Sequence, residues 1–453
     1  MATDSFIIPN VTIVNEGECF QASIRIEGGR ITEIKEERGA KGEELCSSFL
    51  LPGIIDEHVH MREPGLTHKA TMESETRAAA RGGVTTVLDM PNVVPQTTTL
   101  QLLKERYALA DGQCHVNYGF YLGATNDNIE EIKSLDPTLC PGVKLFMGSS
   151  TGGMLVDREE VLRRIFRESP TLVMTHCEDT ARIKSLTLAL SKGQGIFQQF
   201  TPLERAGCRK EEAPIRLHPL IRDHEACYRS TELAVRLAKE TGARLHVAHI
   251  TTAQELDLFE PDDERITAEA CVPHLLFTDA DYETLGARIK CNPAIKTAAD
   301  RDALRKALTD GRIRTVATDH APHLLSEKEG GCLKALSGMP MVQFSLPVML
   351  SLADEGVLSM ERVVELMCHN PARLYGIKDR GFIREDYWAD FTLVRRQPWT
   401  VTKDCIESRC GWSPLEGRTL GWQVEKTWVN GQLVWDGTTF PFPPSGRRVS
   451  FNP

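Results

Sequence analysis

Short apolar runs alternate with helical stretches through the middle of this chain, and no other feature of the sequence constrains its fold as strongly. Eight runs have the length of buried strands, and most are separated by segments with helical periodicity. Strands separated by helices pair in parallel, so eight such units predict an α/β fold with a closed (β/α)8 TIM-like barrel. The predicted strands span residues 53–60, 84–90, 115–121, 143–147, 172–176, 245–249, 266–270 and 315–319. Helices are predicted at 71–81, 158–167, 225–240 and 300–308, with two outer helices around 342–353 and 360–374.

A doubly wound open sheet is the alternative arrangement of the same elements. That fold is favoured when a Gly-x-Gly-x-x-Gly turn follows the first strand, and no such turn follows residues 53–60. We therefore favour the barrel. The stretch 192–219 is long and contains Gly, Pro and charged residues, so we expect an insertion or a long loop at the barrel rim.

Both ends of the chain have the short runs and turn signals of β structure. Residues 6–36 contain strand-like runs around the turn Gly28-Gly29, and Asn430-Gly431 is a strong hairpin signal near the other end. Two small β segments cannot each bury a core, so we expect them to join into one small β-sandwich domain. The predicted domains are residues 1–50 and 381–453 for the two parts of the β-sandwich, and 51–380 for the barrel.

Composition and charge exclude several classes of protein. The 453 residues carry a formal net charge of −10 without a basic block, which argues against nucleic acid or an anionic membrane as partner. No apolar run approaches the roughly 20 residues that span a bilayer, and we expect no signal peptide at the N-terminus. The 13 scattered cysteines form no Cys-x-x-Cys pair, which favours reduced thiols and a cytoplasmic protein.

Histidines and an aspartate stand where predicted strands end, and in a β/α barrel the chemistry lies at this rim. His58 and His60 are two residues apart, so both point to one face of their strand. A single strand-end histidine is more often a packed or capping residue, but His176, His249 and Asp319 end three further strands. Four imidazoles and a carboxylate suit zinc or a similar divalent metal. Five ligands are many for one ion and fit two ions if a further group bridges them.

Lys144 lies inside the fourth apolar run and would repel metal cations as an ammonium. Burial and nearby metal charge would lower its pKa, and the neutral amine could take up carbon dioxide to form an anionic carbamate that bridges two ions. The alternatives are a surface lysine on an edge strand and a lysine paired with an acid. Cys177, next to His176, would point to the opposite strand face and is not expected to be a ligand.

Several motifs together resemble one enzyme family. The pattern Asp56-x-His58-x-His60, a lysine in the fourth strand, two later strand-end histidines and an aspartate after the eighth strand resembles the amidohydrolase superfamily. Four further motifs resemble the dihydroorotases within it: His60-Met61-Arg62-Glu63-Pro64-Gly65, Met90-Pro91-Asn92, Lys290-Cys291-Asn292-Pro293 and Thr318-Asp319-His320-Ala321-Pro322-His323. The resemblance covers nearly the whole chain. Allantoinases share the first of these stretches, and His274-Leu275 stands where many relatives have two adjacent histidines. Some dihydroorotases have an aspartate in place of the fourth-strand lysine.

The resemblance implies a role for each residue. His58 and His60 would bind one zinc ion, His176 and His249 a second, and carboxylated Lys144 would bridge the two; other divalent metals are possible. Asp319 would bind the first ion and carry the proton. Arg62, Asn92 and His323 would hold the carboxylate of a small anionic substrate, with Asn292 against its ring. A guanidinium suits that task, although Arg62 could instead form a rim salt bridge with Glu63.

The implied activity is the reversible interconversion of N-carbamoyl-L-aspartate and (S)-dihydroorotate in pyrimidine (UMP) biosynthesis. A different cyclic-amide hydrolase, such as an allantoinase or a hydantoinase (dihydropyrimidinase), is one alternative. The other is an inactive homologue that serves as a scaffold, which we would expect to have lost metal ligands. We also expect a homodimer or another homo-oligomer.

Overall fold

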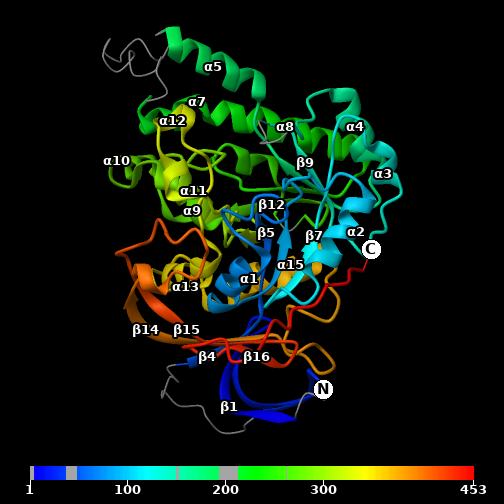
Figure 1. Ribbon diagram of the computed structural model, residues 1–453, viewed down its shortest axis with the longest axis vertical. Helices are drawn as coiled ribbons and strands as arrows, with labels where there is room; N and C mark the ends of the chain where they lie inside the picture. The colour runs from blue at the N-terminus through cyan, green and yellow to red at the C-terminus, as the bar shows by residue number, and fades with distance from the viewer. Residues whose placement is uncertain (1–4, 37–47, 149–152, 193–212, 262, 453) are drawn as a thin grey trace.

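A computed structural model describes residues 5–36, 48–148, 153–192, 213–261 and 263–452 of the chain. It consists of a barrel with helices around it and a β-sheet below it that contains strands from both ends of the chain (Figure 1). Of the predicted rim insertion at 192–219, residues 193–212 lie outside the described residues. In the described part of the chain, no helix combines the length and the apolar character needed to cross a membrane.

Parallel strands form the barrel, and each of the eight predicted runs contributes to it. One group pairs in the order β5–β6–β7 and the other in the order β8 to β13. β8 follows β7 after a single residue, so the two continue as one staggered strand. The ring closes where the His60 amide donates to the His320 carbonyl at 2.7 Å, beside a parallel bridge between Val59 and His320. The strands are β5 (Ile54–Val59), β6 (Val84–Asp89), β7 (Asn117–Phe120), β8 (Leu122–Gly123), β9 (Val143–Phe146), β10 (Val173–His176), β11 (Leu245–Val247), β12 (Ile266–Cys271) and β13 (Thr315–Ala317).

The helices begin and end at residues whose side chains explain the boundaries. Before α1, the Thr71 hydroxyl accepts a hydrogen bond from the Ser74 amide at 3.1 Å, and Asp223 caps α8 in the same way through Ala226. α8 ends at Gly242, whose φ of +77° lies in the left-handed region that glycine adopts easily. The helices are α1 (Met72–Arg81), α2 (Leu100–Ala110), α3 (Ile129–Lys133), α4 (Glu159–Glu168), α5 (Thr180–Lys192), α7 (His218–Ile221), α8 (His224–Thr241), α9 (Val272–Leu276), α10 (Tyr282–Leu285), α11 (Ala298–Ala307), α12 (Gly331–Lys334), α13 (Ser345–Asp354), α14 (Met360–Val364) and α15 (Asn370–Tyr375).

One sheet joins the two ends of the chain, with the strand order β16-β15-β14-β4-β1-β2-β3. Asn430 and Gly431 form the predicted hairpin turn with φ values of +53° and +78°. The fold class is therefore confirmed: a (β/α)8 barrel with a small β-sandwich domain built from both chain ends. The strands are β1 (Phe6–Asn15), β2 (Glu18–Glu27), β3 (Arg30–Glu36), β4 (Ser48–Pro52), β14 (Phe391–Thr400), β15 (Thr419–Val429) and β16 (Gln432–Trp435).

A buried polar cluster around Asp390 attaches this sheet to the barrel. Asp390 forms an ion pair with Arg380, and both side chains are almost fully buried, with 3% and 4% exposure. The same carboxylate accepts hydrogen bonds from the Asn117 side chain at 3.0 Å and from the Asn430 amide at 2.6 Å. Asn117 belongs to β7 of the barrel, so one carboxylate holds parts of both domains.

Removal of this carboxylate should destabilise the protein strongly. Asp390→Ala would leave the Arg380 guanidinium buried without a counter-charge, which typically costs about 3–5 kcal/mol. Glu33→Ala is the control, because the Arg25–Glu33 pair is half exposed and should contribute less than about 1 kcal/mol. Urea unfolding curves of both variants measure the difference. Equal, small losses would show that Asp390 does not hold the domains together.

Candidate active site

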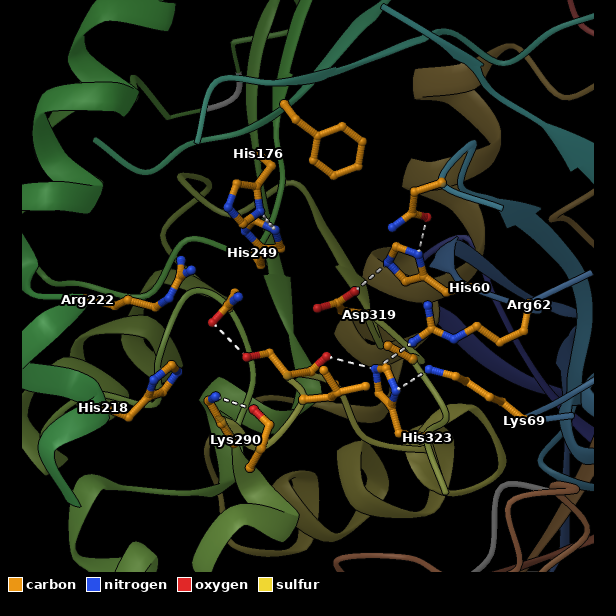
Figure 2. Close-up of a pocket in the computed structure, with 18 of the residues that line it drawn as sticks. His60, Arg62, Lys69, His176, His218, Arg222, His249, Lys290, Asp319 and His323 are labelled. Atoms are coloured by element: carbon orange, nitrogen blue, oxygen red, sulfur yellow. Dashed lines mark hydrogen bonds and ion pairs between the residues drawn. The ribbon is translucent and has the colours of Figure 1, made fainter. Parts of the chain in front are cut away.

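A cavity of about 540 Å³ opens at the carboxyl ends of the barrel strands. Figure 2 shows His60 and Arg62 on one side of Asp319, and His176 and His249 on the other. The structure brings all ten predicted site residues to the wall of this one cavity. They are His58, His60, Arg62, Asn92, Lys144, His176, His249, Asn292, Asp319 and His323.

The backbone is strained at three of these positions. Arg62, His249 and Asp319 have φ values of +67°, +39° and +49°, in the left-handed region that non-glycine residues seldom adopt. Such conformations cost on the order of 1–3 kcal/mol each and persist only where surrounding structure enforces them. Here the buried Asp56 carboxylate accepts hydrogen bonds from the His58 amide and from the amide and hydroxyl of Thr318, at 3.2, 3.2 and 2.6 Å. These bonds fix the end of β5 against the end of β13.

The first group of metal-ligating atoms comes from His58, His60 and Asp319, whose ligand atoms all lie within 4.8 Å of one another. The Nδ1 atom of His58 lies 2.8 Å from the Glu269 carboxylate, and Nδ1 of His60 lies 2.7 Å from the Asn92 carbonyl oxygen. Each Nδ1 must carry the hydrogen to donate to these acceptors, so each Nε2 presents a lone pair. Both Nε2 atoms face Asp319 Oδ1, at 3.4 and 3.0 Å.

His176 and His249 form the second group. The His176 Nε2 atom lies 2.9 Å from the Glu178 carboxylate, so its Nδ1 presents a lone pair, 3.0 Å from Nε2 of His249. Burial lowers the pKa of both imidazoles, which keeps them neutral. The ring of His249 lies 5.3 Å from that of His58, which connects the two groups.

Lys144 lies fully buried beside these histidines. Its Nζ atom has no hydrogen-bond partner among the described residues and lies 5.5 Å from the Phe146 ring centre. Burial lowers the pKa of the Lys144 amine. This burial excludes the surface position considered for Lys144. Because an unpaired buried ammonium is costly, a neutral amine or a modified one remains.

These donor sets fit divalent metal ions. Neutral imidazole nitrogens and a carboxylate oxygen that face one another repel as acceptors unless a cation lies between them. His58, His60 and Asp319 could hold one ion, and His176 and His249 a second. The Lys144 amine, once carboxylated, would add an anionic oxygen ligand to this site.

A cationic corner lies beside the first group. Arg62 donates from Nε to the Pro322 carbonyl at 3.0 Å, and its Nη2 atom lies 3.0 Å from Nε2 of His323. The alternative of a rim salt bridge between Arg62 and Glu63 is not found among the described residues, where the Glu63 carboxylate accepts from the Met72 amide at the start of α1. The Asn92 oxygen is occupied by His60, so its Nδ2 group is the part that can bind an anion. Farther along the wall, the Asn292 oxygen accepts from the Ser337 hydroxyl at 3.0 Å.

Sequence reasoning missed the carboxylates that orient the histidines. Glu269 on β12 accepts from the His58 imidazole and, at 2.9 Å, from the His249 amide. Burial raises the pKa of its carboxyl group, but the neighbouring His58 outweighs this and lowers it to about 2. Glu178 plays the corresponding part for His176 and pairs with Arg222. A charged residue inside a buried strand was the available signal for Glu269.

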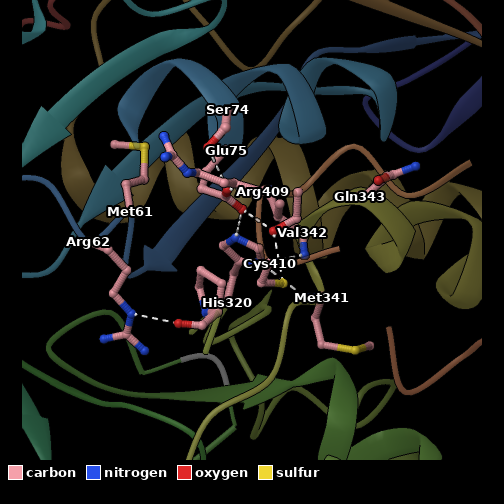
Figure 3. Close-up of polar contacts among 12 residues, drawn as sticks. Met61, Arg62, Ser74, Glu75, His320, Met341, Val342, Gln343, Arg409 and Cys410 are labelled. Atoms are coloured by element: carbon pink, nitrogen blue, oxygen red, sulfur yellow. Dashed lines mark hydrogen bonds and ion pairs between the residues drawn. The ribbon is translucent and has the colours of Figure 1, made fainter. Parts of the chain in front are cut away.

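A second missed network supports the loop that carries Asp319 (Figure 3). The His320 Nε2 atom lies 2.7 Å from the buried Glu75 carboxylate, while its Nδ1 accepts from the Met341 amide at 3.0 Å. Glu75 also accepts from the Ser408 hydroxyl at 2.6 Å and the Arg409 amide at 3.1 Å. The segment between β14 and β15 therefore supports the residue next to Asp319.

Comparison with known proteins defines the class. Residues 49–434 match the model of the amidohydrolase family. A dihydroorotase from Halobacterium salinarum is 35% identical over 86% of this chain and 87% of its own length. An allantoinase from Streptomyces avermitilis is 30% identical over the full length of both chains. The solved structure of an L-hydantoinase (dihydropyrimidinase) from Arthrobacter aurescens superimposes with a TM-score of 0.88 at 25% identity, and covers 98% of this chain and 99% of that one.

The chain belongs to the amidohydrolase family. Its relatives include dihydroorotases, an allantoinase and an L-hydantoinase, so membership alone does not decide among these activities.

Buried histidines should make the protein less stable as the pH falls. Burial lowers the pKa of His246 and His274 from 6.5 to about 4. Below pH 6.5 the unfolded chain binds protons that the folded chain does not, so the free energy of unfolding should fall between pH 6.5 and about 4. Asp56, whose pKa burial raises to about 6, acts in the opposite direction. Urea unfolding near pH 7 and near pH 5 measures how steeply the free energy of unfolding changes with pH. The change should be smaller in His246→Gln. A variant with an unchanged slope would contradict the assignment.

Proposed function

We propose that the protein is a dihydroorotase, which interconverts N-carbamoyl-L-aspartate and dihydroorotate. The observation that carries this proposal is the cationic corner beside the metal-ligating group. Arg62 and His323 lie 6% exposed, next to His60, where they can bind an anionic group of the substrate. Dihydroorotate is a cyclic amide with a carboxylate, whereas allantoin and dihydrouracil lack one. The higher identity to a curated dihydroorotase supports the same choice.

Different residues of the chain bind the metal ions, bind the substrate and transfer the proton. His58, His60 and Asp319 would hold one divalent metal ion, and His176 and His249 another, with carboxylated Lys144 between them. Two such ions, when bound, lower the pKa of a water molecule and polarise the ring amide carbonyl. Arg62, Asn92 and His323 hold the carboxylate and so orient the ring, with Asn292 along its edge. Asp319 accepts the proton of the attacking water and delivers it to the leaving ring nitrogen.

A substrate panel tests the assignment. Purified protein is assayed with dihydroorotate, allantoin, hydantoin and dihydrouracil, after its metal content has been measured. We expect turnover of dihydroorotate to exceed that of each neutral amide. Efficient hydrolysis of allantoin with no activity on dihydroorotate would make the protein an allantoinase. Full metal content without turnover of any cyclic amide would favour the scaffold alternative.

Loss of the guanidinium should weaken binding of the anionic substrate. Arg62→Met should cost about 2–5 kcal/mol in transition-state stabilisation for dihydroorotate, the usual range for breaking a buried charge pair. Metal content should stay unchanged, because Arg62 is not a proposed ligand. Arg362→Met is the control, since this arginine also donates from Nε to a backbone carbonyl, that of Leu308, but away from the cavity. Wild-type protein that hydrolysed dihydrouracil as efficiently as dihydroorotate would contradict the carboxylate site.

Lys144→Ala should remove both metal and activity. Without the carbamate the two proposed ions lose their shared anionic ligand, and short carboxylic acids added to the assay should restore part of the activity. Lys296→Ala is the control, because Lys296 is also a buried lysine but donates to the Ala294 carbonyl outside this cavity. Elemental analysis gives the metal content. Retention of two ions per chain in Lys144→Ala would overturn the role of this lysine.

A further inference from the structure

Lys69 lies in the wall of the cavity and contacts His323. Its Nζ atom lies 3.1 Å from Nδ1 of His323 and 2.9 Å from the Glu327 carboxylate. Lys69 is 7% exposed, so these two groups are its environment rather than solvent. Figure 2 shows Lys69 and Arg62 both directed toward the His323 ring.

The surroundings of His323 determine which nitrogen carries the hydrogen. Burial lowers the pKa of His323, and the nearby Arg62 and Lys69 cations lower it further, so the imidazole is neutral. A neutral imidazole has one N–H and one lone pair, whereas an ammonium can only donate. Lys69 therefore requires the lone pair on Nδ1. The hydrogen is then on Nε2, which donates to the Ser337 carbonyl at 3.0 Å.

The opposite tautomer conflicts with two neighbours. A hydrogen on Nδ1 would face the Lys69 ammonium at 3.1 Å, and a lone pair on Nε2 would face the Ser337 carbonyl at 3.0 Å. In this tautomer Nε2 could accept from Arg62 Nη2 at 3.0 Å, but among the described residues Nδ1 would meet only Glu327 Oε2 at 3.5 Å, an oxygen that also accepts from the Leu324 amide at 2.9 Å.

The favoured tautomer leaves one unfavourable contact, between two donors, which a bound anion would relieve. The Nε2–H of His323 and the Nη2 group of Arg62 are both donors, and they lie 3.0 Å apart. No hydrogen bond can form between two donors. A carboxylate oxygen that binds beside them would accept from Nη2 of Arg62 and share the Nε2–H of His323 with the Ser337 carbonyl in a three-centre hydrogen bond, which relieves the unfavourable contact.

We infer that Lys69 is a positioning residue for substrate choice: its ammonium holds His323 with the hydrogen on Nε2, so that the ring and Arg62 together donate to the substrate carboxylate. This inference rests on the proposed function only in requiring an anionic substrate. Lys69 itself bonds to the far side of the ring and does not contact the substrate.

Kinetics of Lys69→Met separate this role from a structural one. The KM for dihydroorotate should rise about tenfold or more with little change in kcat, because one correctly oriented donor to a charged group is lost. Turnover of dihydrouracil, which has no carboxylate, should not change. In a His323→Asn background, Lys69→Met should cause no further loss, because no imidazole remains to be oriented.

Nitrogen-15 NMR of histidine-labelled protein reads the tautomer directly, with His323→Asn to assign the signal. We expect the hydrogen on Nε2 in the wild type and a shift toward Nδ1 in Lys69→Met. Lys290→Met is the matched control, since this buried lysine lines the same cavity but donates to the Ala335 carbonyl, and it should leave the His323 tautomer unchanged.

Two results would overturn the inference: a hydrogen on Nδ1 in the wild type, or equal losses for dihydroorotate and dihydrouracil in Lys69→Met. If the wild type did not act on dihydroorotate at all, the proposed function would fail, and the NMR experiment would still decide the role of Lys69.

Discussion

Repulsion between hydrogen-bond acceptors at the mouth of the barrel is the constraint on which the chemistry of this site depends. Asn92, Glu269 and Glu178 each take the N–H of one histidine, which directs the lone pairs of those histidines into the cavity. The lone pairs of His58 and His60 then face the Asp319 carboxylate at 3.4 and 3.0 Å. Acceptors at this distance repel each other unless a cation lies between them. The side chains of Glu269, Glu178 and Asn92, which orient the histidines, are therefore as important for metal binding as the ligands themselves.

The rest of the molecule holds these groups in place. Asp56 joins the ends of β5 and β13, which fixes the strained backbone of Asp319. The segment between β14 and β15 reinforces the same loop at two points, through Ser408 on Glu75 and through Trp412, whose indole donates to the His323 carbonyl at 2.7 Å. The β-sandwich domain is therefore a support for the site as well as a connection between the chain ends.

Much of the fold and of the candidate site could be predicted from the sequence, because both depend on the periodic pattern of apolar residues. Apolar runs between helices identified all eight barrel strands, and the alternation of side chains along a strand placed His58 and His60 on one face. Because parallel strands end at one rim of a barrel, we could also predict that residues from six strands line one cavity.

What the sequence did not reveal depends on contacts between residues far apart in the chain. Glu269 is 211 positions from His58, and no local pattern marks that pair. Lys69 lies in a loop, and a lysine in a loop is expected to be a surface residue. Its proposed role depends on contact with His323, which is 254 positions away in the chain. The sequence left open a salt bridge between the neighbours Arg62 and Glu63, but the left-handed φ of Arg62 accompanies a guanidinium that contacts Pro322 and His323, while Glu63 binds the start of α1.

A crystal structure of the zinc-loaded protein, with data collected at the zinc absorption edge, tests most directly whether these groups bind two metal ions. We expect two anomalous peaks, one bound by His58, His60 and Asp319 and one by His176 and His249. Density for a carbamate on Lys144 should reach both. An anomalous map without peaks at these groups, and an unmodified Lys144 ammonium paired with a carboxylate, would contradict this expectation.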